Sequence, residues 1–176
     1  MRCLAFAMLL AASGLCAATL PAIADDGERP FRATISIVDP NPIHETIHGV
    51  TYTSEGATGE ASHLGRVSGP IFYSPATYKV DPVHGPELLF YGFGSFTAAN
   101  GDQLTFSFDD AFVLLTTNAQ GNYPTGFTAT ITGGTGRFAN ASGELFFLGY
   151  VLPQGAGFGP TYFDVAGSIS YDDSGH

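Results

Sequence analysis

The chain has 176 residues and a formal net charge of −10, from 16 acidic and 6 basic side chains. A charge this negative repels nucleic-acid phosphates and anionic membrane surfaces, so neither is an expected partner. Charged residues make up only 12% of the chain, whereas it holds 23 Gly and 15 Phe. This composition is typical of many short strands joined by turns.

The first 24 residues have the pattern of a secretory signal peptide. A short positive start, Met1-Arg2, precedes a broken apolar run over residues 4–20, and the small-x-small triplet Ala22-Ile23-Ala24 predicts cleavage after Ala24. We therefore expect residues 25–176 to form one domain that is secreted or periplasmic, with no stable membrane anchor after cleavage. Cleavage removes the base Arg2 and none of the 16 acids, which leaves five bases and a net charge of −11.

Both cysteines, Cys3 and Cys16, lie inside this leader. The mature chain can therefore form no disulfide, no thiolate metal site and no cysteine nucleophile.

The rest of the chain alternates between apolar and polar residues in short runs. Loops are predicted over residues 54–62 and 75–86, and Asn100-Gly101 is a strong hairpin-turn signal. No stretch has a sustained helical period, so the sequence predicts an antiparallel barrel or sandwich, and the pattern alone does not choose between them. Strands are expected over residues 31–38, 47–53, 63–73, 88–98, 104–108, 112–116, 127–132, 144–152 and 161–171.

A glycine-rich corner over residues 131–143 separates two of these strands. Its glycines permit positive φ or close backbone contact, and one helical turn over residues 136–141 is expected to cover Phe138. A phosphate-binding loop is the alternative, but the corner has no Gly-Lys-Ser/Thr ending and no long helix follows it. A structural corner is the better interpretation.

The same corner resembles the pattern I-x-G-G-T-G-x-F-x-x-A-x-G of the dirigent and allene oxide cyclase-like barrel proteins, in particular their small secreted bacterial members. The resemblance implies an eight-stranded antiparallel barrel, often trimeric, that needs no cofactor and holds a small apolar ligand in its mouth. If the protein is an enzyme, the resemblance implies a cofactor-free cyclase or isomerase. The family's catalytic residues do not match one by one here, and the matched positions are fold residues. Those positions are Ile131, Gly133, Gly134, Thr135, Gly136, Phe138, Ala141 and Gly143.

The strand over residues 145–152 is apolar on both faces. One face can fill a barrel, and the other needs cover from a loop or a second subunit. The sequence therefore predicts a homo-oligomer, a dimer or a trimer, packed partly through this strand.

His44-Glu45-Thr46-Ile47-His48 matches the His-Glu-x-x-His signature of zinc proteases. That chemistry needs a helix that places both imidazoles on one face, with the glutamate as general base. Flanking prolines, Gly49 and two β-branched residues disfavour a helix. We therefore expect no metal site, with a zinc-dependent hydrolase that uses these residues as the second interpretation.

The remaining candidates depend on which strand face points inward, which a one-residue slip would reverse. His63 and Arg66 could hold an anionic or carbonyl group, or could be surface cations. Glu144 and Asp164 are candidate acid–base groups if aromatic neighbours bury them, and otherwise lie at a rim or a turn. The predicted ligand-binding set is His63, Arg66, Tyr91, Tyr150 and Tyr162, with Tyr73 as a further hydroxyl.

Three functions remain open at this point. The first is a barrel that binds a small apolar or aromatic molecule, with or without steering its cyclisation or coupling. The second is the zinc hydrolase. The third is a structural or partner-binding envelope protein whose barrel is filled by its own aromatic side chains.

Overall fold

The computed structural model describes residues 27–38, 41–155 and 157–172, so the predicted signal peptide and its cleavage site lie outside the described residues. These residues form strands and one short 3₁₀ turn. No described helix has the length and apolar character needed to cross a membrane. The elements are β1 (Glu28–Ile37), β2 (Ile43–Ile47), β3 (Val50–Ala61), β4 (Gly65–Tyr73), β5 (Thr77–Asp81), β6 (Gly85–Ala98), β7 (Gln103–Leu114), β8 (Tyr123–Gly134), η1 (Gly136–Phe138), β9 (Ser142–Gln154) and β10 (Gly157–Ser170).

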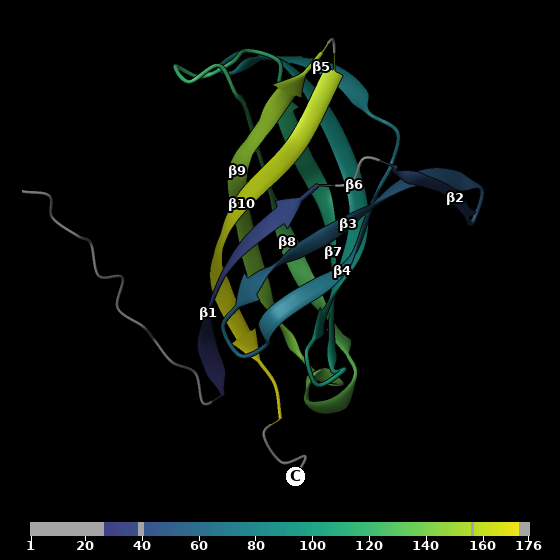
Figure 1. Ribbon diagram of the computed structural model, residues 1–176, viewed down its shortest axis with the longest axis vertical. Helices are drawn as coiled ribbons and strands as arrows, with labels where there is room; N and C mark the ends of the chain where they lie inside the picture. The colour runs from purple at the N-terminus through teal and green to yellow at the C-terminus, as the bar shows by residue number, and fades with distance from the viewer. Residues whose placement is uncertain (1–26, 39–40, 156, 173–176) are drawn as a thin grey trace, which may run out of the picture.

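Eight of the strands close into a ring (Figure 1). Neighbouring strands follow the order β1-β10-β9-β8-β7-β6-β4-β3, and residues 33–37 of β1 pair with residues 57–61 of β3 to close it. Every pairing is antiparallel. The predicted all-β, eight-stranded antiparallel barrel is therefore confirmed, and closure leaves no free edge within the ring.

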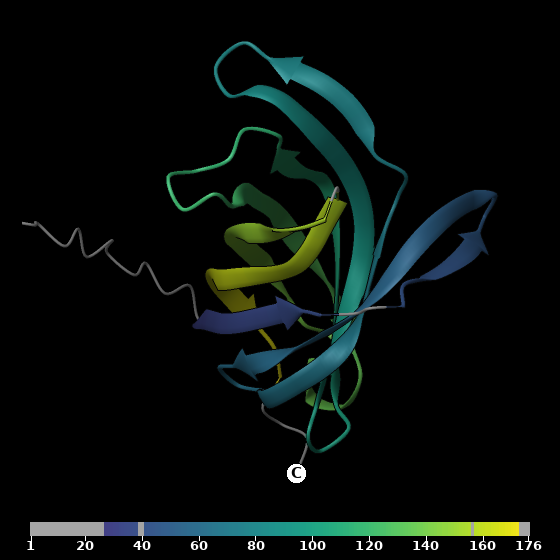
Figure 2. The ribbon, with the colours of Figure 1, turned by 45° about the horizontal axis from the view of Figure 1, so that its top comes forward.

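Two strands lie outside this ring. β2 pairs with the first half of β3, and β5 pairs with the first residues of β6. Figure 2 shows both hairpins standing away from the ring. The prediction of a loop over residues 75–86 was therefore wrong for β5.

The prediction of a loop over residues 54–62 was also wrong, because β3 runs unbroken through residues 54–61. A Cβ at Gly59 would lie 2.0 Å from the carbonyl oxygen of Thr34 on β1. Glycine here permits close strand contact instead of breaking the strand. The next strand, β4, begins at Gly65, and His63 lies in the preceding turn with a φ of 66°.

Aromatic side chains fill the half of the barrel nearer the corner. Phe96, Phe106 and Phe147 are almost fully buried. The Phe147 ring stacks on Phe127 with centroids 4.2 Å apart and packs against Phe106 at 5.6 Å. This half has the packed interior expected of a structural or partner-binding protein with a filled barrel, whereas the other half does not.

The glycine corner closes this end of the barrel. As predicted, one short helical turn covers Phe138, which has no exposed surface and packs 5.0 Å from the ring of Tyr171. Arg137 lies over the Phe138 ring at 4.9 Å and donates a hydrogen bond to the carbonyl of His63. Arg29 donates to the Tyr171 hydroxyl at 2.9 Å. The corner is thus a structural plug, which agrees with the interpretation against a phosphate loop.

The β5–β6 hairpin contains a turn that should respond to acid. Asp81 Oδ1 accepts the backbone N–H groups of His84 at 2.9 Å and Val83 at 2.8 Å, and these bonds hold the pKa of Asp81 below its ordinary value. A lowered folded-state pKa means that the stabilisation is present above the unfolded pKa and is lost as pH falls through the folded pKa. We expect the Val83 and His84 amide resonances to shift below about pH 4. The Asp81→Asn variant, whose amide oxygen stays neutral, should show no such titration, and a wild-type turn that is insensitive to acid would contradict the assignment.

Candidate functional site

The end of the barrel opposite the corner holds a cavity of about 380 Å³. Its wall is largely aromatic and aliphatic because the inward-facing positions of β6, β7, β8 and β10 carry Phe90, Phe108, Phe127 and Phe163 here. Ala111 and Val113 of β7 add small side chains to the same wall, which leaves the space open. This half of the barrel is therefore hollow where the other half is packed.

A carboxyl–phenol pair is the main polar feature of this cavity. The Tyr73 hydroxyl donates a hydrogen bond of 2.8 Å to Glu55 Oε1, and the Tyr73 ring lies edge-on to Phe90. Glu55 is the one charged side chain among the described lining residues. A carboxylate in such a wall is a strong acceptor for a hydroxyl of a bound molecule.

Two other polar side chains in the wall serve the backbone. Thr125 donates to the carbonyl of Phe112 at 2.6 Å. Ser74 donates to the carbonyl of Pro75 and accepts the N–H of Tyr91 at 3.1 Å. Glu55 is the one charged group among the described lining residues, and we therefore take its carboxyl, oriented by Tyr73, as the candidate for recognising a polar group of a ligand.

Of the sequence-predicted groups, Tyr73 reaches this cavity, whereas the strand face that carries Glu144 does not. In β9 the buried positions are Leu145, Phe147 and Val151, and the alternate residues point to solvent. The prediction that the face carrying Glu144 and Tyr150 points into the barrel was therefore wrong. Alternation separates the two faces, but both faces of β9 carry large apolar residues, so the pattern does not choose between them.

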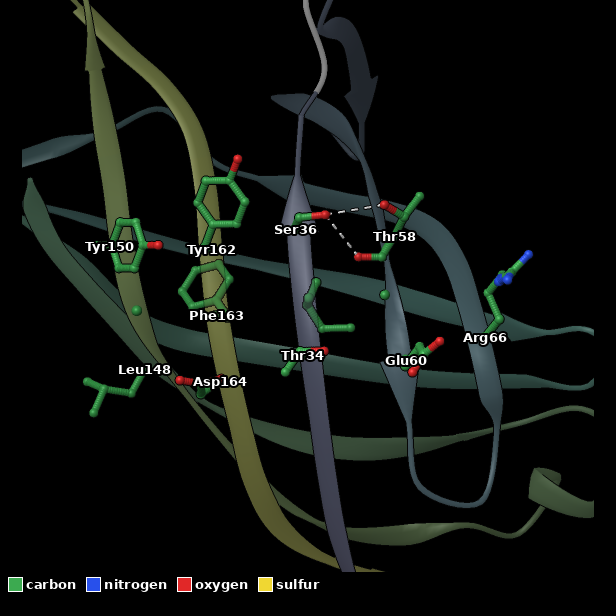
Figure 3. A pocket seen from close by; sticks show the side chains of 13 residues that line it. Thr34, Ser36, Thr58, Glu60, Arg66, Leu148, Tyr150, Tyr162, Phe163 and Asp164 are labelled. Carbon is green, nitrogen blue, oxygen red and sulfur yellow. Dashed lines mark hydrogen bonds between the residues drawn. The ribbon is translucent and has the colours of Figure 1, made fainter.

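The same outward orientation holds for the other candidates on β9 and β10. Tyr150, Tyr162 and Asp164 are exposed on the outer surface of the barrel, as Figure 3 shows. Arg66 of β4 is exposed on the same side. The structure therefore brings Arg66, Tyr150, Tyr162 and Asp164 to one outer surface and not to the barrel mouth.

His63 and Tyr91 lie elsewhere. His63 is in the β3–β4 turn at the closed end, where its Nε2 lies 2.9 Å from the carbonyl of Pro30. Tyr91 is exposed on the outer face of β6, edge-on to Tyr52. Burial raises the pKa of Tyr52, and the neighbouring Tyr91 raises it further. Neither His63 nor Tyr91 lines the cavity at the barrel mouth.

The His-Glu-x-x-His segment is a β-hairpin and not a helix. His44 lies in β2 with its Nδ1 3.2 Å from Thr53 Oγ1, and His48 is in the β2–β3 turn with a φ of 49°. The one-turn helical spacing that a zinc protease needs is therefore not formed. Within residues 27–38, 41–155 and 157–172, no three histidine, cysteine or acidic side chains gather as a metal site would require.

Sequence reasoning missed Glu55, because its segment was assigned to a loop. Extending the alternation of the predicted strand over residues 47–53 would have placed Glu55 on the same face as Thr53 and the buried Ala57. The misleading signal was the glycine content of the segment.

No family model and no curated protein matches the chain. Among solved structures, it is similar to the pterocarpan synthase dirigent protein GePTS1, with 16% identity, 87% of this chain and 96% of that chain covered, and a TM-score of 0.46. It is also similar to a protein of unknown function from Clostridium acetobutylicum, with 9% identity, 82% of this chain and 99% of that chain covered, and a TM-score of 0.41. The first of these bears a family name that the glycine corner suggested. At this level of similarity neither structure assigns a ligand or an activity to this chain.

Proposed function

We propose that this protein binds a small, largely apolar molecule in the open half of its barrel. The observation that carries the proposal is the cavity of about 380 Å³, whose aromatic wall contains one hydrogen-bonded carboxyl–phenol pair. Binding sites for small molecules are commonly of this size, mostly apolar, with few polar groups that fix orientation.

The wall also indicates the chemistry of the ligand. Phe90, Phe108, Phe127 and Phe163 offer ring faces and edges that favour an aromatic or alicyclic ligand. Glu55 favours a ligand that carries a hydroxyl and disfavours one that carries a carboxylate, because like charges repel in an apolar site.

Confinement of a flexible ligand in this cavity would also favour ring closure or coupling, since fixed orientation lowers the entropic part of a barrier. This extension of the proposal matches what the family resemblance implies. The exported location and the homo-oligomer remain predictions from the sequence.

Filling the cavity should weaken binding. Ala111 lies in the cavity wall, and we expect Ala111→Phe to weaken binding of the neutral fluorescent probe N-phenyl-1-naphthylamine by about tenfold or more, because the new ring occupies the ligand's space. Thr130→Phe, at an exposed position of β8, is the matched control and should bind the probe like wild type. Equal binding by wild type and Ala111→Phe, with unchanged circular dichroism, would refute the cavity as the site.

The role of Glu55 can be tested separately with 2-naphthol and naphthalene as competitors of the probe. We expect Glu55→Gln to weaken the binding of 2-naphthol by about tenfold and to leave the binding of naphthalene unchanged. Only 2-naphthol can donate a hydrogen bond to the carboxylate. An equal effect on both competitors would mean that Glu55 shapes the cavity and does not recognise a hydroxyl.

A further inference from the structure

A groove of about 610 Å³ crosses the outer surface of the barrel, away from the proposed ligand cavity. Figure 3 shows that it extends over β9, β10, β1, β3 and β4. Its floor is β1, where the short side chains of Thr34 and Ser36 point outward between longer side chains on both sides. Ser36 makes hydrogen bonds to the hydroxyl and carbonyl of Thr58 at 3.3 Å, which joins the floor to β3.

One wall of this groove is aromatic. Tyr150 and Tyr162 are direct partners across the β9–β10 pairing, and their ring centroids lie 5.5 Å apart with an interplanar angle of 33°. The two residues are 38% and 37% exposed, and Leu148 extends the wall. The rings form a broad apolar surface with a hydroxyl at each edge.

The rest of the groove lining carries charged side chains that form no hydrogen bond or ion pair among the described residues. Glu60 and Arg66 are partners across the β3–β4 pairing, and Asp164 lies next to the tyrosine wall. Within the described part of the chain, none of these three side chains has a hydrogen bond or an ion pair. Their donors and acceptors therefore face solvent in the groove.

The groove is longer than this first hollow. A second hollow of about 840 Å³ shares Thr34, Glu60, Arg66 and Asp164 with it and continues along β1 to Arg32. A continuous channel with repeated polar groups suits an extended ligand better than a compact one.

We propose that this groove binds a neutral oligosaccharide. The C–H face of a pyranose ring can pack on Tyr150 and Tyr162, while its hydroxyls donate to Asp164 and Glu60 and accept from Arg66. An anionic polymer is disfavoured by the net charge of −10. A purely apolar ligand would leave the groove's charged groups unsatisfied.

A second copy of the chain is the competing occupant, since Phe146 and Leu148 are also exposed on β9. A subunit seated here would bury Glu60, Arg66 and Asp164 without partners from their own chain, which is costly unless the second copy pairs with each of them. Hydroxyl-rich sugars satisfy the same groups without that requirement.

The test is a titration with cellotetraose, chitotetraose, maltotetraose and laminaritetraose, followed by amide chemical shifts of the ¹⁵N-labelled protein. We expect at least one of them to shift resonances on β1, β9 and β10 around the groove. Tyr162→Ala should weaken that binding by about tenfold and Tyr162→Phe by less than about threefold, because the ring and not the hydroxyl makes the stacking contact. Phe146→Ala is the matched control, because this residue is an exposed aromatic on β9 outside the groove lining.

Absence of any shift at millimolar sugar with all four compounds would overturn the proposal. So would shifts that persist unchanged in Tyr162→Ala, since the sugar would then bind elsewhere. An oligomer that dissociates in Tyr162→Ala, measured by light scattering, would assign the groove to a second copy. Binding of N-phenyl-1-naphthylamine in the same variants separates this proposal from the barrel cavity, because Tyr162→Ala should leave it unchanged.

Discussion

Replacing Phe147 by alanine is expected to lower the free energy of unfolding by about 3–5 kcal/mol. The side chain is 2% exposed and lies inside the barrel, between the packed half and the cavity-lining rings of Phe127 and Phe163. It stacks on Phe127 at 4.2 Å and contacts Phe106 and Phe163 at 5.6 and 5.7 Å. Because these rings belong to different strands of a closed ring, the strands cannot collapse far into the space left behind, and a cavity remains.

Urea denaturation followed by circular dichroism measures this loss, and Phe146→Ala supplies the control. Phe146 is the preceding residue of the same strand, is 50% exposed and points outward. Its replacement should cost no more than about 1 kcal/mol. Similar costs for the two variants would contradict the inward orientation of Phe147, and with it the corrected assignment of the two faces of β9.

The variant Gly134→Ala should destabilise the barrel by about 3 kcal/mol, at the upper end of the usual cost of overpacking. A Cβ at this position would lie 1.9 Å from the carbonyl oxygen of Gln103 on β7 and 3.1 Å from the Cβ of Phe138. The first contact is with backbone, so β7 and β8 must separate where the corner begins. The same movement would displace the short turn η1 that contains the buried Phe138.

Gly157→Ala is the matched control for this substitution. Gly157 lies at the start of β10, and its nearest heavy atom to an added Cβ is the carbonyl oxygen of Gln154 at 3.9 Å, an ordinary contact. We expect a change within about 0.5 kcal/mol. Thermal unfolding of both variants decides the matter, and a Gly134→Ala protein as stable as Gly157→Ala would show that the β7–β8 contact is looser than described.

The fold was predictable where the sequence states a local requirement. Alternation located β1 and β9 closely, and the spacing of Gly134, Gly136 and Phe138 indicated a corner with a buried ring. Ring closure could not be read from alternation, because the β1–β3 pairing joins residues that no local pattern relates. The resemblance carried by the corner supplied the barrel.

The candidate site was less predictable, for a physical reason. Which face of a strand points inward depends on the whole barrel, and β9 offers Leu145 and Phe147 on one face against Phe146 and Leu148 on the other. The wrong orientation moved Tyr150 and Tyr162 into an interior that they do not line. Glu55 was overlooked because the glycines near it indicated a loop, although one of them, Gly59, permits close contact with β1.

The position of β1 between β3 and β10 has a consequence for how the chain acquires its structure. β1 pairs along its whole length with β10, the last strand of the ring, through partners as far apart in sequence as Glu28 and Ser170. Contacts this distant in sequence form slowly because a long loop must close first. The first strand of the ring therefore cannot complete its pairing before the last one is available. A chain that emerges progressively from a ribosome or a translocation channel cannot close its barrel until β10 has emerged.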